Sequence, residues 1–488
     1  MSSEQKRKMT FWSMVAYGSG DIFGGGTPTT VAALYTLFLT TVAGVHPLTV
    51  GMIFLIVKIM SAVVNPVIGY ITDHTRSRWG RRRIYFLFGC IPFFALPWIM
   101  LNFDSQLAKT LWYGGTFIIY NICWSIVSVP YYSILADMTS DYTERSKATG
   151  MRMFFSKLGT LIGTWVPLTI VGMFTVKSQG YMVMGIVVGL IYAVPWFICF
   201  LFTWEREDIV IEKTHGVFTE MINLYKNFLS TLRNSSFRKH LLMYLGALTT
   251  FDIFMAVFIL SVTITMGKTL NFARDVLATV QVCQFIGLPL ITWLCCKYSN
   301  STGYVITAVF LALSIVAFGM MPNDATYLQM SIVGLFTGMG IAGTVMSAWN
   351  NLPFIADVDE IITTKRREGI YAGFQAFTRQ VCQGLGMLMI NLTLSYIGFV
   401  AGTGEQSEAT REGIRHFMMI APPIILLIGI LGAIFFKINK QNHAILMGEI
   451  HRLKDGGSKT NVQPKVKKVV ESLTGIKYDN LWKADLVK

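Results

Sequence analysis

The chain has 488 residues, of which 53% are apolar and only 14% are charged, and its mean hydropathy is +0.52. Soluble domains carry about 25% charged residues, so this composition excludes an ordinary soluble protein and favours an all-α protein of the membrane. The formal net charge is +14, but the basic residues cluster in alternate loops, as the positive-inside rule requires. We therefore expect no nucleic-acid partner.

Twelve apolar segments follow one another along the chain, and most are long enough to cross a bilayer as a helix of about 20 residues. They predict twelve transmembrane helices, near 11–41, 48–71, 84–102, 110–137, 147–175, 181–203, 240–266, 276–298, 303–321, 327–356, 369–399 and 414–437.

The loop at 73–83, between the second and third segments, holds five arginines and fixes the expected orientation. Basic loops of this kind stay on the cytoplasmic side of the cell membrane. Since the predicted number of helices is even, both termini and the middle segment 204–239 are expected there too. The polar, basic tail 438–488 is expected to be solvated or to touch lipid.

An internal repeat divides the segments into six and six. Asp137 and Asp357 lie at the ends of corresponding segments, 220 residues apart. Arg145 and Lys365, which follow them, are separated by the same interval. Two parallel six-helix halves, at 1–203 and 240–437, are the pattern of the major facilitator fold. The sequence therefore predicts that fold, with 204–239 as a cytoplasmic middle loop.

Signals for enzymatic chemistry are absent from the sequence. Six of the seven cysteines lie in apolar segments, and no CxxC motif or cluster of cysteine and histidine occurs. No phosphate-binding GxxxxGK[ST] motif is present either. We therefore expect no metal, no cofactor, no direct use of ATP and no enzyme activity.

Four motifs, in order, resemble those of the glycoside–pentoside–hexuronide:cation symporters, the melibiose-permease family. They are YGSGD at 17–21, PVIGYITDHTRSRWGRRR at 66–83, Val129-Pro130-Tyr131 with Glu144-Arg145, and DVDEIITTKRREG at 357–369. The resemblance covers about residues 11–437. It implies a secondary transporter that moves a small-molecule sugar (a glycoside, pentoside or hexuronide) across the bilayer by alternating access.

Ionisable residues within the segments are candidates for function, because each costs about 2.5 kcal/mol or more at the bilayer centre. They are Asp21, Lys58, Arg152, Lys157, Asp252 and Arg379. For Asp21 two interpretations stay open: it accepts hydrogen bonds from a sugar or pairs with a cation, or it pairs with a basic residue of the fifth segment purely for structure. The glycines at 24–26 allow bending or a close approach of another helix.

The resemblance implies a substrate site made by Asp21, Ser128, Tyr132, Arg152, Arg379 and Gln380. Arg152 corresponds to an arginine that holds sugar hydroxyls, and Tyr132 to a tryptophan that stacks on the sugar; snorkelling of Arg152 and ordinary packing of Tyr132 are the alternatives. Gln380 stands where the family usually has lysine. Gln375, Arg379 and Gln383 share a helix face, which we expect to line the cavity or to meet Asp252.

The expected coupling region comprises Lys58, Ser61, Asn65, Asp21 and Asp252. Lys58, Ser61 and Asn65 share one helix face. In the resembled family the positions of Ser61 and Asn65 are typically aspartates of the cation site, and Ser128 is also neutral here. This departure favours proton coupling or uncoupled transport over sodium coupling. A sodium symporter with an altered site, or side chains that only pack the helix interface, are the alternatives.

For gating, we expect Arg76 or Arg78 to pair with Asp137 or Asp141 when the cytoplasmic side closes. A different class of function also stays open: a sugar sensor on a transporter fold, which binds substrate without net flux. The basic tail and the neutral coupling region motivate that alternative.

Overall fold

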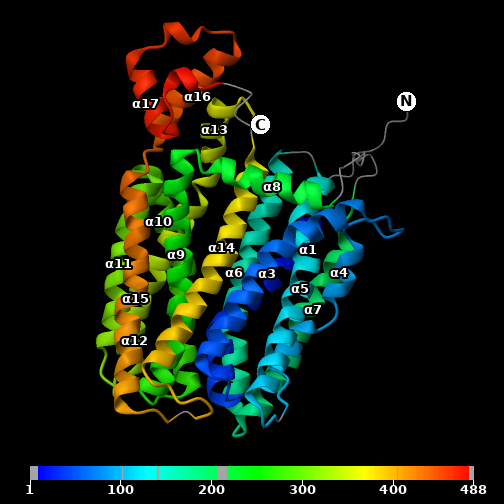
Figure 1. Cartoon of the computed structure of the whole chain (residues 1–488), viewed down its shortest axis with the longest axis vertical. Coiled ribbons are helices and arrows are strands. Elements are labelled where there is room, and N and C mark those ends of the chain that lie inside the picture. The colour runs from blue at the N-terminus through cyan, green and yellow to red at the C-terminus, as the bar shows by residue number, and fades with distance from the viewer. Residues whose placement is uncertain are drawn as a thin grey trace. The chain divides into compact units, whose positions relative to one another are not determined.

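The computed structural model describes residues 9–101, 103–139, 142–205, 217–365, 367–403 and 405–482, and every regular element in these ranges is helical (Figure 1). The α-helices are α1 (Phe11–Ser19), α2 (Asp21–Leu37), α3 (Pro47–His74), α4 (Ile84–Gly89), α5 (Gln106–Met138), α6 (Tyr142–Met173), α7 (Lys177–Phe202), α8 (Val217–Thr231), α9 (Ser235–Leu260), α10 (Leu270–Lys297), α11 (Asn300–Met320), α12 (Tyr327–Trp349), α13 (Leu352–Thr363), α14 (Glu368–Tyr396), α15 (Glu408–Phe435), α16 (Lys440–Lys454) and α17 (Pro464–Thr474).

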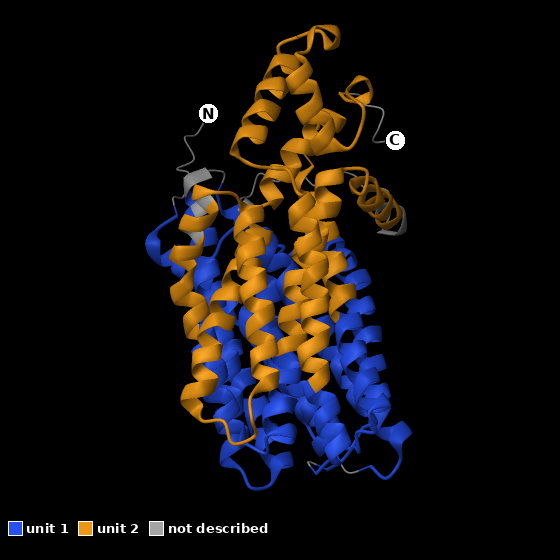
Figure 2. Cartoon of the chain, turned by 90° about the vertical axis from the view of Figure 1, so that its left-hand side faces the viewer, with its two compact units in different colours: residues 1–217, 255–281, 384–415 blue, residues 218–254, 282–383, 416–488 orange. Residues whose placement is uncertain are grey.

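The chain forms two compact units, which Figure 2 colours separately. Unit 1 comprises residues 1–217, 255–281 and 384–415, and unit 2 comprises 218–254, 282–383 and 416–488. Residues of α9, α10, α14 and α15 belong to both units. The compact units are therefore not the sequence halves that the internal repeat predicts.

Ten helices within the described ranges are long and apolar enough to span a membrane. The predicted third segment is instead broken into α4 and a 3₁₀-helix, Phe93–Trp98. Pro92 and Pro97 explain the break, because proline has no N–H to continue an α-helix. The predicted eleventh segment is α14, which is long enough, but the polar stripe with Gln375 and Arg379 lowers its hydropathy.

Two helix ends support the internal repeat independently of the sequence motifs. Helix α2 continues into a π-helical turn at Phe38–Val42, and α9 continues into another at Ser261–Thr265. Each turn is followed by a glycine in the left-handed region, Gly44 at φ +66° and Gly267 at φ +65°. The two terminations lie 223 residues apart, as expected for corresponding first helices of two halves.

Glycines bring α2 and α6 into backbone contact within unit 1. A Cβ on Gly25 would overlap the backbone oxygen of Ser156, and a Cβ on Gly159 would overlap that of Ile22. Small residues at such crossings let two helices approach closely in a membrane. The expected role of the glycine run is confirmed, and the start of α2 is held against α6.

The C-terminal tail contains a folded helical pair, which was not predicted from the sequence. Lys465 and Lys468 of its basic stretch are exposed, and the expectation that this stretch is solvated or touches lipid stays a prediction. Leu446 and Ile450 of α16 and Val470 and Leu473 of α17 are fully buried, because both helices have an apolar face. In Figure 2 the pair is the orange part that projects beyond the spanning helices of unit 2. The backbone N–H of Trp482 also donates to the Ile361 carbonyl of α13 at 2.9 Å.

A polar cluster ties α16 to the segment that follows α17. Glu449 of α16 accepts hydrogen bonds from Arg452 and from the Tyr478 hydroxyl. Burial, together with the neighbouring Glu449 carboxylate, raises the pKa of Tyr478 to about 12, so its hydroxyl remains a donor at neutral pH. The tail is thus a specific structure rather than a charged extension.

Candidate functional site

Asp21, Arg152 and Tyr132 come together within unit 1, and we call them the Asp21 cluster. The Arg152 Nε and Asp21 Oδ2 atoms are 3.9 Å apart, and the Tyr132 hydroxyl donates to Asp21 Oδ1 at 3.5 Å. The Arg152 guanidinium lies over the Tyr132 ring, 5.2 Å from its centre. Three helices therefore contribute: α2 provides the acid, α5 the aromatic ring and α6 the guanidinium.

The Asp21 cluster has unused hydrogen-bonding capacity. Arg152 Nε is buried and makes no hydrogen bond among the described residues. The buried Tyr17 hydroxyl lies close enough to Arg152 to interact with it electrostatically. Asp21 itself is only 5% exposed, whereas 43% of Tyr132 is accessible. A guanidinium presents five donors, and a separation of 3.9 Å to Asp21 leaves them available to another acceptor.

A second charged pair lies in unit 2. Arg379 of α14 and Asp252 of α9 are 2.6 Å apart, and the Asp252 side chain is buried. The structure thus places in contact the two residues that the polar stripe suggested as partners. His240 Nε2 and Gln375 Oε1 of the same helices lie 2.9 Å apart, whereas Gln380 Oε1 is buried without a protein partner among the described residues.

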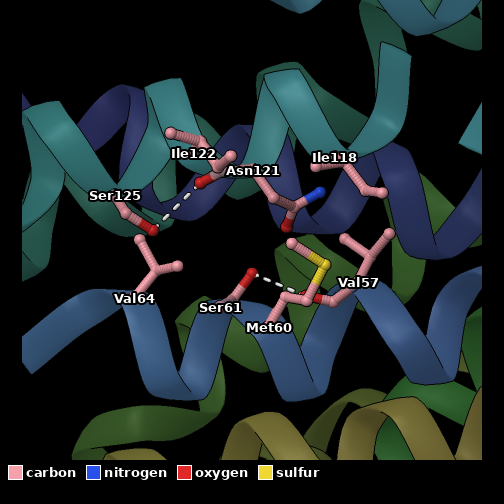
Figure 3. Close-up of a pocket in the computed structure, with 8 residues that line it drawn as sticks. All are labelled: Val57, Met60, Ser61, Val64, Ile118, Asn121, Ile122 and Ser125. Carbon is pink, nitrogen blue, oxygen red and sulfur yellow. Dashed lines mark hydrogen bonds between the residues drawn. The ribbon is translucent and has the colours of Figure 1, made fainter. Parts of the chain in front are cut away.

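Ser61 lies on a small pocket between α3 and α5, shown in Figure 3. The pocket has a volume of about 10 Å³, which is roughly the room that one water molecule needs. The Ser61 hydroxyl donates to the Val57 carbonyl of its own helix at 2.9 Å, and Ser125 does the same to Asn121. No lining residue is acidic: Val57, Met60, Ser61, Val64, Ile118, Asn121, Ile122 and Ser125.

The other residues of the expected coupling region do not complete a charged cage around Ser61. Asn65 Oδ1 and Ser128 Oγ are buried, and neither has a hydrogen-bond partner in the described part of the chain. Lys58 lies where α3 crosses α14, and its Cβ would be 3.0 Å from a Cβ on Gly384. The pocket at Ser61 thus has no charged lining residue, and the expected coupling region stays a prediction.

The gating arginines that we expected are not those that meet Asp137. Arg76 and Arg78 are exposed, whereas Arg82 Nη1 and Arg81 Nη2 contact Asp137 Oδ2 at 2.7 and 3.1 Å. The turn at Gly80, with φ +100°, redirects the chain and points the following two residues to the end of α5. The other expected acid, Asp141, lies outside the described residues.

Glu205 also organises this loop, although no sequence motif predicted a role for it. Its carboxylate accepts hydrogen bonds from the backbone N–H groups of Arg81, Arg82 and Arg83 at 2.9 to 3.0 Å. A Cβ at Gly80 would crowd the same carboxylate. The only sequence feature that could have predicted this role is the position of Glu205, an acidic residue just after the sixth predicted segment. More than 120 residues separate it from the loop that it binds, so the sequence does not reveal the contact.

Residues 16–440 match the family of MFS/sugar transport proteins. The chain belongs to this family. It is therefore a multi-pass membrane transporter of the major facilitator fold and not an enzyme, as the sequence predicted.

This MFS family member is similar in sequence to two proteins that differ in the substrate that their names give. It is 25% identical to the isoprimeverose transporter of Lactiplantibacillus pentosus, over 89% of this chain and 90% of that one. It is 22% identical to the sodium-dependent lysophosphatidylcholine symporter 1-A of Danio rerio, over 90% and 88%. A crystal structure of a D-xylose-proton symporter shares the fold, with a TM-score of 0.61 and 15% identity over 87% and 96%.

Asp137→Asn is expected to lower the thermal unfolding temperature of the purified transporter, because Arg81 and Arg82 both lose their charged acceptor. The loss should correspond to about 1–3 kcal/mol, the usual contribution of hydrogen bonds to charged groups. Arg76→Gln, an exposed position in the same loop, is the matched control and should stay within about 0.5 kcal/mol of the parent. Equal effects of the two changes would show that Asp137 does not hold the loop.

Proposed function

We propose that this transporter carries a sugar, and that the Asp21 cluster binds it, with the arginine-rich loop on the cytoplasmic side. The observation that carries the proposal is the loose Asp21–Arg152 pair beside a half-exposed aromatic ring. A guanidinium and a carboxylate together offer donors and acceptors to adjacent hydroxyls, and a tyrosine ring packs against the apolar face of a pyranose or furanose. The related isoprimeverose transporter of Lactiplantibacillus pentosus supports the same substrate class.

The two charged pairs have different geometries and, in this proposal, different roles. At 3.9 Å the Asp21 Oδ2 and Arg152 Nε atoms make no direct hydrogen bond, so a hydroxyl beside them can bond to both groups, whereas the Asp252–Arg379 pair, at 2.6 Å, is in direct contact. A closed buried pair is disrupted only at a considerable cost in free energy. We assign substrate recognition to the first pair, and to the second a supporting role for α9 and α14.

Transport is proposed to be independent of sodium. Sodium needs oxygen ligands and compensating negative charge to shed its water, and the pocket at Ser61 has no acidic lining residue. Asn65 and Ser128 add neutral oxygens only. If transport is coupled, a proton is the expected ion, with Asp21 the first candidate to bind it and Asp252 the second.

Uptake into proteoliposomes, with sodium and pH gradients imposed separately, tests both parts of this proposal. We expect counterflow of at least one member of a panel of radiolabelled glycosides, pentosides and hexuronides, with no stimulation by an inward sodium gradient at constant pH. Binding without counterflow would identify a sensor instead. Strong sodium stimulation would contradict the coupling proposal. Uptake of lysophosphatidylcholine, assayed beside the sugar panel, with no counterflow of any sugar would contradict the substrate class.

A further inference from the structure

A large cavity lies in unit 2 where the transport helices meet the C-terminal tail. Its volume is about 590 Å³, within the range of about 300–1,000 Å³ that is usual for small-molecule sites. It is formed by the end of α10, the start of α11, the junction of α12 and α13, and the start of α16. The lining residues are Cys295, Tyr298, Ser299, Asn300, Met346, Asn350, Asn351, Phe354, Ile438, Asn439, Lys440, His443 and Ala444.

The side chains around this cavity favour an anion. The lining includes Lys440, His443 and four asparagines but no carboxylate. Lys297 is next to the lining residue Tyr298 in the chain, and its Nζ lies over the Trp293 and Tyr298 rings, 4.8 and 5.4 Å from their centres. Amide and ammonium donors together suit the oxygens of a phosphate group.

The backbone adds to this positive character. Three helices begin at the cavity, with Ser299, Asn351 and Asn439 as the residues that precede α11, α13 and α16. Helix N-termini carry partial positive charge from the helix dipole. The dipole is the main contribution here, because the Ser299 and Asn439 side chains already accept from the N–H groups of Thr302 and Asn442, and Pro353 of α13 has no N–H. The Asn351 side chain makes no capping bond to α13, because its Oδ1 accepts from Asn300 Nδ2 at 3.0 Å.

Two acidic residues of α13 near the cavity are paired with basic residues of α16, which leaves Lys440 as the lining cation without an acidic partner among the described residues. Asp357 of α13 contacts His443 Nε2 at 2.9 Å, and Glu360 contacts Lys454 at 2.5 Å. These contacts fix α16 on α13 and so hold the tail side of the cavity in place. The cavity exists only because the tail is folded against the transport helices of this unit.

We propose that this cavity is a binding site for a phosphate group, carried either by a soluble anion or by the headgroup of an anionic lipid. The volume exceeds what inorganic phosphate needs, so the natural ligand has a further polar group attached. The site is separate from the Asp21 cluster and does not depend on the proposed sugar transport. Occupation would stabilise the contact between α13 and the tail.

The test measures the thermal unfolding of the full-length protein in two settings. The first uses an uncharged detergent with inorganic phosphate, compared with chloride at equal ionic strength, because a ligand that binds the folded state raises the unfolding temperature. The second uses phosphatidylcholine nanodiscs with or without phosphatidic acid, in the absence of free phosphate. The variants are Lys440→Gln and Asn350→Asp, and Lys465→Gln on α17 is a control that removes the same charge away from the cavity.

Stabilisation is expected for the parent and for Lys465→Gln, with the apparent affinity about tenfold weaker in Lys440→Gln and Asn350→Asp. A higher unfolding temperature with inorganic phosphate would identify the ligand as a soluble anion. A higher unfolding temperature with phosphatidic acid alone would identify it as a lipid headgroup. If Asn350→Asp does not fold, the response of Lys440→Gln to phosphate still tests the proposal, because Lys440 is exposed and its substitution should not disturb folding. No response in either setting, or equal weakening in Lys465→Gln, would overturn the proposal.

Discussion

Arg152→Ala is expected to weaken sugar binding by at least about a hundredfold, because two or more charge-assisted hydrogen bonds are lost at about 1.5–3 kcal/mol each. The 3.9 Å separation from Asp21 and the ring of Tyr132 beneath the guanidinium leave Arg152 placed to receive a ligand. Arg152→Lys keeps the charge but loses the planar fork, so an intermediate affinity is expected. Binding to the purified protein, measured by calorimetry, gives the comparison.

Loss of folding must be separated from loss of binding in this experiment. Arg152→Ala leaves the buried Asp21 carboxylate without its cation, which by itself destabilises the protein. The double variant Asp21→Asn/Arg152→Ala removes both charges and should recover thermal stability without recovering affinity. Unchanged affinity in the folded Arg152→Ala protein would remove this residue from the substrate site.

Gly25→Ala is expected to destabilise the transporter by at least about 1–3 kcal/mol, the usual cost of overpacking a tight contact. The new Cβ would overlap the backbone oxygen of Ser156, which cannot rotate away as a side chain would. Helices α2 and α6 must then separate, and the Asp21–Arg152 distance grows with them. The expected result is a lower unfolding temperature together with weaker sugar binding.

Gly115→Ala is the matched control for this change. Gly115 also lies within a helix, α5, but a Cβ there would have no neighbour within 4 Å. Since alanine favours helices by about 1 kcal/mol over glycine, a neutral or slightly stabilising effect is expected. Unchanged stability and binding in Gly25→Ala would mean that close contact between α2 and α6 is not needed for the site.

The sequence by itself determined the class of protein, most of its helices and the charged residues worth testing. Hydropathy and loop charge are local properties, so ten of the twelve predicted spans appear as long apolar helices. The third does not, since Pro92 and Pro97 break it; these residues were visible in the sequence, but their effect was not predicted. Motifs in family order likewise pointed to the transporter family that residues 16–440 match.

Only the tertiary structure decided which groups meet. Asp137 pairs with Arg81 and Arg82 rather than Arg76, and the choice follows from the direction of one turn. The two intramembrane pairs differ, at 3.9 and 2.6 Å, because helix packing and not residue type sets those distances. The tail and its cavity depend in the same way on contacts between segments about ninety residues apart, such as His443 with Asp357, and periodicity along one segment carries no information about such contacts.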